Sequence, residues 1–425
     1  MTQQQTRFTV IGLGGYGLVH IDAITWLENQ GLGKLHGVVA LPEDRKREPE
    51  RTASLQERDV ELYTDIEEFY NEGMEETDVL TVPIGIHAHV PVSVRAMEAG
   101  LDVYCEKPVA GTVQEADELI RAEQRTGRKI TIGFQHLYSH SMNQLKQRIC
   151  DGRLGPVESL DLLCGWPRSK QYYTRNSWAG KLSHHGRWIL DTPANNANAH
   201  YLMNLLYLAS DQPGSAISPE SVRAELYRAN HIESADTLQM RLGLPNGAIG
   251  NVLLTHANRR ATGPFMHLRC AHGHVVWQTD NGKTFIHYDS GEIEQFDNLA
   301  DENWRYLGFL DLVEAIREDR TPVCTPELSR HQTLTINAAH ESCPEILTIP
   351  EEMISEEEDW EMFPPDTRGD FRRIQDLDEY MYIAFHERRF LSRLEIPWAE
   401  EINSREFYTN DYNRFPTNEN IQKNH

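Results

Sequence analysis

Three glycines near the start of the chain have the spacing that a phosphate-binding turn requires. Gly12, Gly14 and Gly17 form the pattern G-x-G-x-x-G, directly after the apolar run at 8–11 and directly before a helical pattern. In such a turn the first glycine allows the bend, the second lets a pyrophosphate approach the backbone, and the third lets the helix pack on the strand. The N–H groups at the helix start would then bind the phosphates. The residues expected to bind the dinucleotide here are Gly12, Gly14, Gly15, Tyr16 and Gly17.

The residue that would bind the adenosine ribose is missing from its usual place. An acidic residue normally ends the next strand, about 20 positions further on, but here that strand ends with Ala40. Glu43 or Asp44 could bind the ribose from a longer turn, or Arg45 and Lys46 could bind the 2′-phosphate of NADP. An exposed loop is the third interpretation. The prediction is NAD or NADP, with a slight preference for NAD and with tight retention as one outcome.

A second group of residues follows a strand-like run at 101–105. Lys107, in the tripeptide Glu106-Lys107-Pro108, can assist removal of a hydroxyl proton while a hydride passes to nicotinamide, provided its pKa is lowered. Because Lys107 follows a strand, we expect it at the carboxyl edge of a parallel sheet, where doubly wound sheets bind ligands. An exposed loop lysine is the alternative.

Two kinds of pattern indicate the elements that must position these residues. Residues 1–133 alternate the strand-like runs RFTVIG, LHGVVA, DVLTVP, LDVYCEKP and KITIG with helical patterns, which predicts a doubly wound parallel sheet. Beyond them, Asn246-Gly247 and Asn281-Gly282 lie between strand-like runs and favour two-residue hairpin turns, in which both positions have φ above zero. The predicted fold class is α/β: an N-terminal Rossmann dinucleotide-binding domain and a C-terminal α+β domain with a large, mainly antiparallel open sheet.

We expect three parts along the chain. Residues 1–133 form the dinucleotide-binding domain, and residues 134–350 form a domain for substrate binding and oligomerisation. Residues 351–425 form a C-terminal extension that packs on the domains. It begins with an acidic stretch containing paired prolines, which predicts an extended surface segment, and it continues with a helical pattern.

Composition limits the partners. The chain has 65 Asp plus Glu against 41 Lys plus Arg, a net charge of −24, which disfavours nucleic acid as a partner. No apolar run is long enough to span a bilayer, and the first residues do not resemble a signal peptide. The six cysteines show no CxxC spacing, so we expect reduced thiols and no metal site. These features predict a cytoplasmic protein without membrane contacts.

The motifs, taken in order, resemble the Gfo/Idh/MocA family of NAD(P)-dependent oxidoreductases. The matching pieces are the glycine turn, Pro83 with His87, Ala99-Gly100, Glu106-Lys107-Pro108 and Gly152-x-Leu154-Gly155, within residues 7–210. The resemblance implies that Lys107 binds substrate or transfers a proton. It also implies that the bond before Pro108 is cis. The further cofactor-binding residues that it implies are Pro83, His87, Glu106, Lys107 and Pro108.

One position departs from the family pattern. The family commonly has an aspartate and, four residues later on one helical face, an acid/base histidine; this sequence has Asp191 but Asn195, followed by Asn196. An amide can orient a hydroxyl but cannot carry a proton near neutral pH. Three explanations stay open: Lys107 acts alone, His184 or His185 substitutes, or dehydrogenase activity has been lost. His200 lies in a pattern typical of a buried helix.

The candidate site residues follow from these patterns. Those expected to act in catalysis are Lys107, Asp191, Asn195 and His185. Those expected to contact substrate are Tyr138, Trp166, Arg168, Trp178, His184 and Asn196, with Tyr172 and Tyr173 nearby in sequence. Aromatic faces suit sugar rings, and Arg168 would suit a carboxylate or sulfonate, although core packing is the alternative for each aromatic residue.

The resemblance implies an oxidoreductase acting on a secondary hydroxyl of a sugar, glycoside or cyclitol. A variant would retain NAD and use transient oxidation to cleave a glycosidic bond by elimination, without net redox change. A non-catalytic dinucleotide or sugar sensor is the alternative of another class. A homo-oligomer, dimer or tetramer, is also implied by the resemblance.

Overall fold

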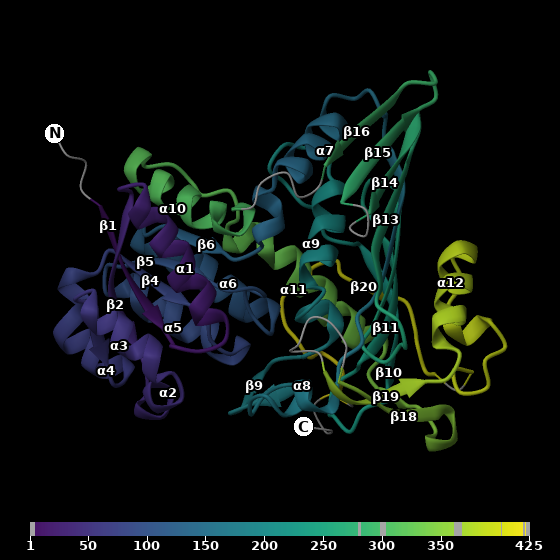
Figure 1. Cartoon of the computed structure of the whole chain (residues 1–425). Coiled ribbons are helices and arrows are strands. Elements are labelled where there is room, and N and C mark those ends of the chain that lie inside the picture. Colours follow the sequence, from purple (N-terminus) through teal and green to yellow (C-terminus); the bar gives the residue numbers. More distant parts are fainter. Residues whose placement is uncertain are drawn as a thin grey trace. The chain divides into compact units, whose positions relative to one another are not determined.

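The computed structural model describes residues 5–278, 282–297, 303–360, 368–400, 402–419 and 421 (Figure 1). The chain forms two compact units. The first contains the described residues of Met1–Ala110, Glu115–Ser139 and Glu302–Arg330, and the second contains those of Gly111–Gln114, His140–Asp301 and His331–His425. The segment at 302–330, expected in the second domain, therefore packs with the first unit.

The first unit is built on a six-stranded sheet with the order β3-β2-β1-β4-β5-β6. Every neighbouring pair in this sheet is parallel. The strands are β1 (Thr6–Ile11), β2 (Gly33–Val39), β3 (Glu61–Tyr63), β4 (Val79–Val82), β5 (Asp102–Cys105) and β6 (Ile130–Ile132). The predicted doubly wound sheet is confirmed, and β3 is the strand that the sequence pattern did not indicate.

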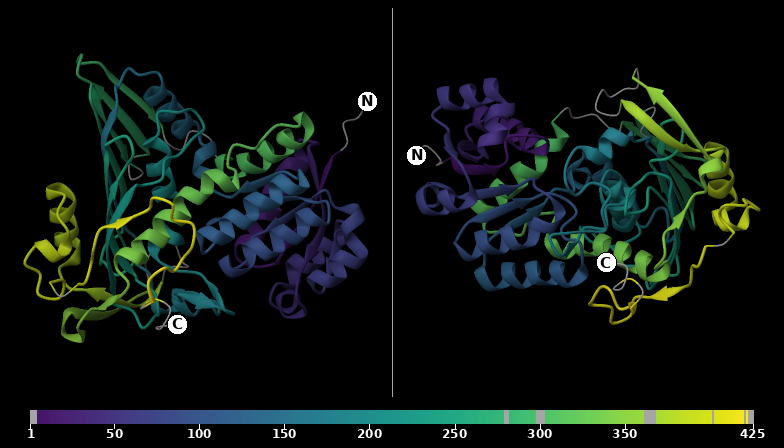
Figure 2. Two further views of the ribbon diagram at one scale, coloured as in Figure 1. Left: turned by 180° about the vertical axis from the view of Figure 1, so that it is seen from behind. Right: turned by 90° about the horizontal axis from the view of Figure 1, so that it is seen from below.

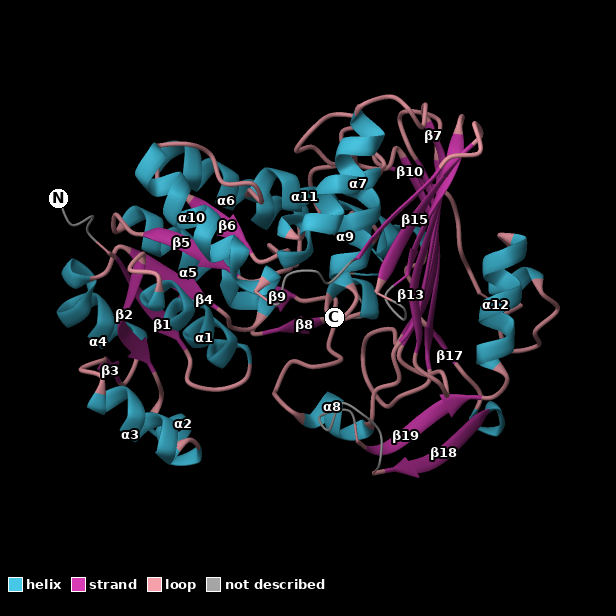
Figure 3. Cartoon of the chain, turned by 45° about the horizontal axis from the view of Figure 1, so that its top comes forward, coloured by secondary structure: helices cyan, strands magenta, loops and turns pink. Residues whose placement is uncertain are grey.

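Helices surround this sheet (Figure 3). They are α1 (Tyr16–Asn29), α2 (Pro42–Arg47), α3 (Pro49–Glu57), α4 (Ile66–Glu68), α5 (Ile86–Glu98), α6 (Val113–Thr126) and α10 (Leu307–Glu318), with the short turns η1 (Phe69–Gly73), η2 (Met74–Glu76), η3 (Gln135–Tyr138) and η5 (Trp304–Tyr306). Phe309 and Leu312 of α10 belong to the same buried cluster as Phe8 and Ile24. Burial of these side chains explains why the late segment 302–330 folds with the N-terminal unit.

The second unit is built on a mixed, mostly antiparallel sheet with the order β16-β15-β14-β13-β7-β12-β11-β10-β17, and β20 also pairs with β10. Its strands are β7 (Val157–Gly165), β10 (Ser221–Arg228), β11 (Thr237–Gly243), β12 (Ile249–Thr255), β13 (Thr262–Cys270), β14 (Gly273–Gln278), β15 (Lys283–Tyr288), β16 (Ile293–Asp297), β17 (Leu347–Thr348) and β20 (Phe407–Tyr408). The α/β class and the large sheet are thus confirmed.

One of the two predicted hairpin turns lies among the described residues. Asn246 and Gly247 connect β11 to β12, which are antiparallel, and Gly247 has a φ of 82°. This left-handed conformation explains the glycine. The predicted two-residue turn is wrong, because the connection runs from Leu244 to Ala248 and Asn246 does not have a positive φ. Asn281 of the other predicted turn lies outside the described residues.

The second unit also contains helices, some of which cover the two faces of its large sheet. They are α7 (His140–Cys150), α8 (Lys170–Thr174), α9 (Ala199–Leu208), α11 (Pro326–Ser342) and α12 (Leu377–Glu387), with the turns η4 (Pro193–Asn195), η6 (Glu351–Met353) and η8 (Leu391–Arg393). Figures 1 and 2 show α7 and α9 along one face and α12 against the other. Leu377 and Met381 of α12 are buried with Leu163 and Leu253 of the sheet. The C-terminal region therefore closes part of this unit's own core.

The acidic stretch expected to be an extended surface segment is part of a hairpin. Its strands are β18 (Ile354–Asp359) and β19 (Gly369–Ile374), which pair antiparallel (Figure 3). Arg372 of β19 is 4% exposed and forms ion pairs with Glu351 and Glu356 at 2.7 Å. Part of the acidic charge is therefore neutralised within the hairpin region.

Two further expectations can be compared with the described part of the chain. Its helices include none that is long and apolar enough to cross a membrane. All six cysteines are free, and no cluster of three or more His, Cys, Asp or Glu among the described residues is arranged to hold a metal ion.

Candidate active site

The glycine turn has the geometry that its spacing predicts. Gly12 and Gly15 have φ values of 101° and 54°, and α1 begins directly after Gly15. A Cβ atom added to Gly17 would lie 2.5 Å from the backbone oxygen of Gly12, whereas one added to Gly14 would meet no atom within 4 Å. Gly17 is therefore required for helix packing, and the backbone at Gly14 is open to a ligand such as a pyrophosphate.

The end of β2 shows how the ribose-binding candidates differ. Glu43 is exposed, and Asp44 forms an ion pair with Arg47 at 3.5 Å. The Nε of Arg45 donates to the backbone oxygen of Ala40 at 3.0 Å. Its Nη2 is buried and has no hydrogen-bond partner among the described residues. Of the candidates, Arg45 is the side chain that folds back over the end of β2.

Glu106 fixes the backbone that carries Lys107. Its side chain is buried; Oε2 accepts a hydrogen bond from the N–H of Lys107 at 3.2 Å, and Oε1 lies 3.2 Å from Nε2 of His20. His20 is fully buried against the rings of Tyr104 and Phe309, at centroid distances of 5.3 and 5.0 Å. The tripeptide is thus anchored to α1 as well as to its own strand.

Pro108 is held by a histidine that the sequence analysis did not single out. The peptide bond from Lys107 to Pro108 is cis, as the resemblance implied. Nδ1 of His89 lies 2.7 Å from the backbone oxygen of Pro108, and Nε2 lies 3.0 Å from that of Ile84. Burial lowers the pKa of His89. His89 therefore connects the tripeptide to the start of α5, on which the predicted residue His87 is half-buried; Pro83 directly follows β4.

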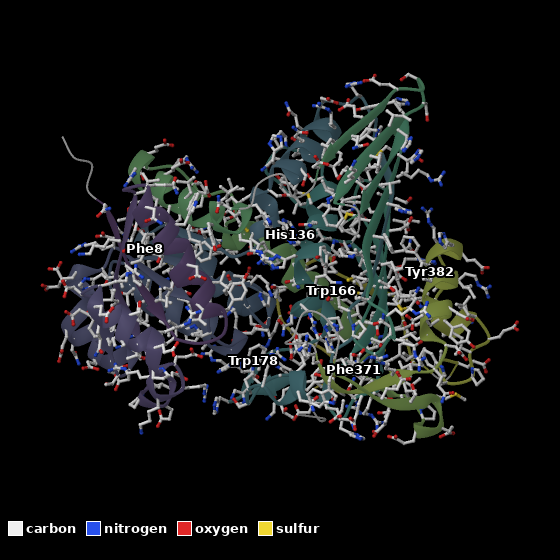
Figure 4. The ribbon with its side chains drawn as sticks, viewed as in Figure 1. Phe8, His136, Trp166, Trp178, Phe371 and Tyr382 are labelled. Carbon is white, nitrogen blue, oxygen red and sulfur yellow. The ribbon has the colours of Figure 1, made fainter. Side chains whose placement is uncertain are left out.

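The surroundings of Lys107 contain further polar groups of the first unit. Lys107 is half-buried. Burial, with the nearby charges of Arg305 and Lys107, lowers the pKa of His136 to about 3. The hydroxyl of Tyr16 donates to Oε1 of Gln135 at 3.0 Å, so the start of α1 is joined to η3. His136 is labelled in Figure 4.

Tyr138 has an environment typical of the core. It is 8% exposed, and its hydroxyl accepts a hydrogen bond from the N–H of Cys324 at 3.3 Å. It lies in the first unit, whereas the other predicted substrate contacts lie in the second. The structure therefore favours the packing interpretation for Tyr138.

Asp191 and Asn195 do not share a helical face. Residues 193–195 form the short turn η4, and α9 begins only at Ala199. Asp191 accepts hydrogen bonds from the N–H of Gly180 at 2.6 Å and from Nδ2 of Asn196 at 2.7 Å. The shared helical face of the family pattern is therefore absent at these two residues, because the chain turns before α9 begins.

Asn195 is a buried link between two segments. It is 1% exposed; its Nδ2 donates to the backbone oxygen of Ile189 at 2.8 Å, and its Oδ1 accepts from Nε2 of Gln332 at 3.1 Å. Gln332 also donates to the backbone oxygen of Ala194 at 2.9 Å. Through these hydrogen bonds the Asn195 amide holds the loop against α11.

His184 and His185 lie on a small hairpin formed by β8 (Ser183–His184) and β9 (Arg187–Trp188). His185 has a φ of 48°, lies at the turn and is exposed. Nε2 of His184 lies 3.2 Å from Oγ of Ser177. This environment agrees with the surface interpretation at least as well as with a catalytic one.

An aromatic and cationic cluster gathers most of the remaining candidates. The guanidinium of Arg168 lies 5.0 Å from the ring centre of Tyr172 and 5.8 Å from that of Trp166. The guanidinium of Arg175 lies 3.6 Å from the ring centre of Tyr172 and 5.6 Å from that of Trp178. Trp166 and Trp178 are labelled in Figure 4. We name these five residues the Tyr172 cluster.

His256 completes this cluster and was missed by the sequence analysis. Its Nδ1 lies 2.8 Å from the backbone oxygen of Trp166, and its backbone oxygen accepts from the N–H of Arg168 at 3.0 Å. Burial, helped by the charge of Arg168, lowers its pKa to about 3. His256 follows β12, far from Trp166 in sequence, and no local pattern indicates that the two lie together.

A cavity of about 550 Å³ adjoins the segment that carries the cluster. Tyr173 lines it, together with the basic residues Lys170, Lys181 and Arg372. Glu233 is the acidic residue in its wall. The cavity wall is therefore predominantly basic, although Arg372 and Lys170 already pair with carboxylates.

Comparison with known proteins identifies the first unit's fold. Residues 6–134 match the model of an oxidoreductase family with an NAD-binding Rossmann fold. The matched model is that of the Gfo/Idh/MocA family, the family that the sequence motifs resemble. The match covers β1 to β6 and includes both the glycine turn and Glu106-Lys107-Pro108.

Two named relatives are similar to this chain over part of their length. Inositol 2-dehydrogenase of Salmonella typhimurium is 29% identical over 146 residues, which is 34% of this chain and 42% of that protein. The 2,7-anhydro-N-acetylneuraminate hydratase of Mediterraneibacter gnavus is 30% identical over 148 residues, 32% of this chain and 38% of that protein. The matched region thus spans less than half of each of these two relatives.

One solved structure extends the likeness of the fold. The WlbA dehydrogenase from Bordetella pertussis, in complex with NADH and UDP-GlcNAcA, has a TM-score of 0.66 and 19% identity. The match covers 80% of this chain and 96% of that chain. The similarity in fold therefore continues beyond the residues that match the family model.

Proposed function

We propose that the protein is an NAD(P)-dependent oxidoreductase acting on a secondary hydroxyl of a sugar, glycoside or cyclitol. One observation carries the proposal: a glycine turn shaped for a pyrophosphate and the buried anchor of Lys107 occur in the same compact unit. The similarity to inositol 2-dehydrogenase supports a polyhydroxylated substrate.

The residues of the first unit fit a dinucleotide. Gly14 leaves its backbone open, and Gly17 allows α1 to start close behind the turn. Arg45 at the end of β2 suits a 2′-phosphate, which supports acceptance of NADP as well as NAD. When bound, the dinucleotide supplies the hydride acceptor for oxidation of an alcohol.

Lys107 is the residue we assign to proton transfer. Glu106 and His89 hold the backbone on either side of it, so the position from which its side chain extends is fixed. Its position after β5 is the place where doubly wound sheets bind ligands. In this role the amine takes the proton of the substrate hydroxyl as that hydroxyl is oxidised.

The second unit supplies the proposed substrate contacts. Trp166, Trp178 and Tyr172 offer aromatic faces for a sugar ring. Asp191 and Asn196 are hydrogen-bonded to each other and orient substrate hydroxyls in this proposal, while Asn195 supports the loop. His184 and His185 are secondary candidates for contact with substrate.

A redox-neutral reaction is the second candidate function. The similarity to a relative named as a hydratase favours chemistry without net production of reduced cofactor. Such a reaction would retain the dinucleotide and cleave a glycoside by elimination. A non-catalytic sensor is a further candidate, which Asn195 favours. It would be supported if the protein binds a dinucleotide but turns over no substrate.

The test begins with the freshly purified full chain. Absorbance and fluorescence in the reduced-nicotinamide band are measured first, followed by mass spectrometry of whatever heat releases. Retained cofactor would support the redox-neutral reaction, and reversible binding of added NAD or NADP would support an ordinary dehydrogenase. Failure to bind either dinucleotide would contradict the proposal.

A further inference from the structure

Two arginines of the second unit surround one aromatic ring. The guanidinium of Arg175 lies 3.6 Å from the ring centre of Tyr172, and that of Arg168 lies 5.0 Å from it. Among the residues that the structure describes, no carboxylate lies within 4.0 Å of either guanidinium. Arg175 instead donates to the backbone oxygen of Tyr172. Two like charges thus share a ring without an acidic partner.

Several other arginines of the same unit have such partners, although not all of them do. Arg148 pairs with Glu294 at 2.7 Å, Arg153 pairs with Glu292 at 2.9 Å, and Arg388 pairs with Asp161 at 2.5 Å. The chain also has an excess of acidic residues, 65 against 41 basic ones. What distinguishes Arg168 and Arg175 is that both guanidinium groups lie at one aromatic ring, where neither has a carboxylate partner among the described residues and an anion can pair with both.

Buried polar atoms near the ring point in the same direction. Nε of Arg168, the hydroxyl oxygen of Tyr173 and Nε2 of His256 are buried and have no hydrogen-bond partner among the described residues. Buried polar atoms without partners are rare in folded proteins, because each one lowers the free energy of unfolding. A polar ligand would satisfy them.

Two acidic residues lie near this ring, Asp191 and Asp236, and the carboxylates of both accept hydrogen bonds from neighbouring protein groups. Asp191 affects the pKa of Tyr172 and of Tyr173, so it lies nearby. Its carboxylate accepts hydrogen bonds from the N–H of Gly180 at 2.6 Å and from Nδ2 of Asn196 at 2.7 Å. The carboxylate of Asp236 accepts hydrogen bonds from the N–H groups of Ala229 at 3.0 Å and Asn230 at 2.7 Å. Neither arginine lies within ion-pair distance of either aspartate.

We propose that the Tyr172 cluster recognises a saccharide carrying an anionic group, a carboxylate or a phosphate. Arg168 and Arg175 bind the anion, and the aromatic rings of the cluster contact the sugar. Guanidinium groups match the planar, bidentate geometry of carboxylates and phosphates. This inference rests on the proposed function, because it names the substrate class of the proposed reaction.

The experiment compares three probes with the full chain in the presence of NAD or NADP. The probes are methyl β-D-glucuronide, glucose 6-phosphate and the neutral methyl β-D-glucoside. Binding is measured by calorimetry and turnover by reduced-nicotinamide absorbance. The variants are Arg168→Gln and Arg175→Gln, and the control is Arg269→Gln, an exposed arginine on β13. Unchanged circular dichroism and cofactor affinity confirm that each variant folds.

We expect the wild-type protein to bind an anionic probe at least about tenfold more tightly than the glucoside, because charge-assisted hydrogen bonds stabilise the complex. Either arginine variant should lose about that factor for the anionic probe and little for the glucoside, and Arg269→Gln should lose neither. Preference for the glucuronide identifies a carboxylate, and preference for glucose 6-phosphate identifies a phosphate.

Two outcomes separate this inference from the proposed function. Turnover of the glucoside with no preference for either anionic probe would overturn the inference and leave the oxidoreductase intact. Selective, arginine-dependent binding of an anionic probe without any turnover would support the cluster's role and contradict the enzymatic proposal. Equal loss of all three probes in Arg168→Gln would also overturn the inference.

Discussion

The dinucleotide region and the Tyr172 cluster differ in how the chain builds them. The glycine turn occupies six consecutive positions, and its shape depends on backbone conformations that glycine alone adopts easily. The Tyr172 cluster instead joins residues 166–178 to His256, which follows a different strand. A function encoded in contiguous backbone can be predicted from sequence, whereas one assembled from distant side chains must be found in the fold.

The largest expected effect tests whether Lys107, in the dinucleotide region, transfers a proton during the reaction. Replacing Lys107 with alanine should lower turnover by about 10²- to 10⁴-fold, the usual contribution of a proton-transferring side chain. Cofactor affinity should change little, because Glu106 and His89 still hold the backbone. Steady-state kinetics and a cofactor titration measure the two effects. Lys34→Ala, at an exposed position of β2, is the control, and unaltered turnover in Lys107→Ala would remove the assigned role.

The second prediction divides the glycine turn into a structural and a ligand-binding part. Gly17→Ala places a Cβ 2.5 Å from the oxygen of Gly12, so α1 must shift, and we expect a loss of about 3 kcal/mol in unfolding free energy. Gly14→Ala meets no atom within 4 Å and should fold normally while binding dinucleotide more weakly. Thermal melts with and without cofactor distinguish the two. Equal stability of both variants would contradict this division.

Sequence reasoning succeeded where local patterns determine structure. The runs that predicted β1, β2, β4, β5 and β6 are short and apolar because both faces of a doubly wound sheet are buried. β3 was missed because it has three residues, of which Glu61 is exposed. The return of 302–330 to the first unit depends on the burial of Phe309 and Leu312, and no local pattern encodes which core a helix joins.

The candidate site shows the same limit. Lys107 and its cis bond followed from a contiguous motif, but His20 and His89 support that motif through contacts across the fold. His20 lies three residues after Gly17 and could have been suspected from its place on α1. Asp191 and Asn195 have helical spacing without a helix, because η4 ends before α9 begins.

The third prediction concerns Asn195, at which that helix is absent. Restoring the family histidine by Asn195→His should not increase turnover, because Asn195 is 1% exposed and bonded to Ile189 and Gln332. We expect instead a loss of about 1–3 kcal/mol in unfolding free energy from the broken buried hydrogen bonds. Denaturant unfolding and kinetics measure both effects. Asn196→His, at a half-buried position, is the comparison variant; a gain in turnover from Asn195→His would contradict the supporting role.

The fourth prediction uses the buried histidine of the Tyr172 cluster. The pKa of His256 is lowered from 6.5 to about 3, so between these values the unfolded chain binds a proton that the folded chain does not. His256 therefore lowers the unfolding free energy as pH falls below 6.5, by about 2 kcal/mol at pH 5.

The variant His256→Gln isolates this contribution. Its unfolding free energy should fall less between pH 7 and pH 5 than that of the wild-type protein, by about the same 2 kcal/mol. His386→Gln, which alters an exposed histidine on α12, should follow the wild-type pH dependence. Parallel curves for the wild-type protein and His256→Gln would mean that His256 is not buried in its neutral form.

The smallest expected effect concerns the end of β2 in the dinucleotide region, where Ala40 stands in place of the usual acidic residue. Arg45 donates to the backbone oxygen of Ala40, and its Nη2 has no partner among the described residues, so a 2′-phosphate could accept from it. Arg45→Gln should weaken NADP binding by about tenfold, the value of one charge-assisted hydrogen bond, and NAD binding by less. Titrations with both dinucleotides measure the ratio, with Arg51→Gln on α3 as the control. An unchanged ratio of NADP to NAD affinity in Arg45→Gln would show that the end of β2 does not contact the ribose 2′ position. The glycine turn would then be the part of the first unit whose role in dinucleotide binding follows from its sequence.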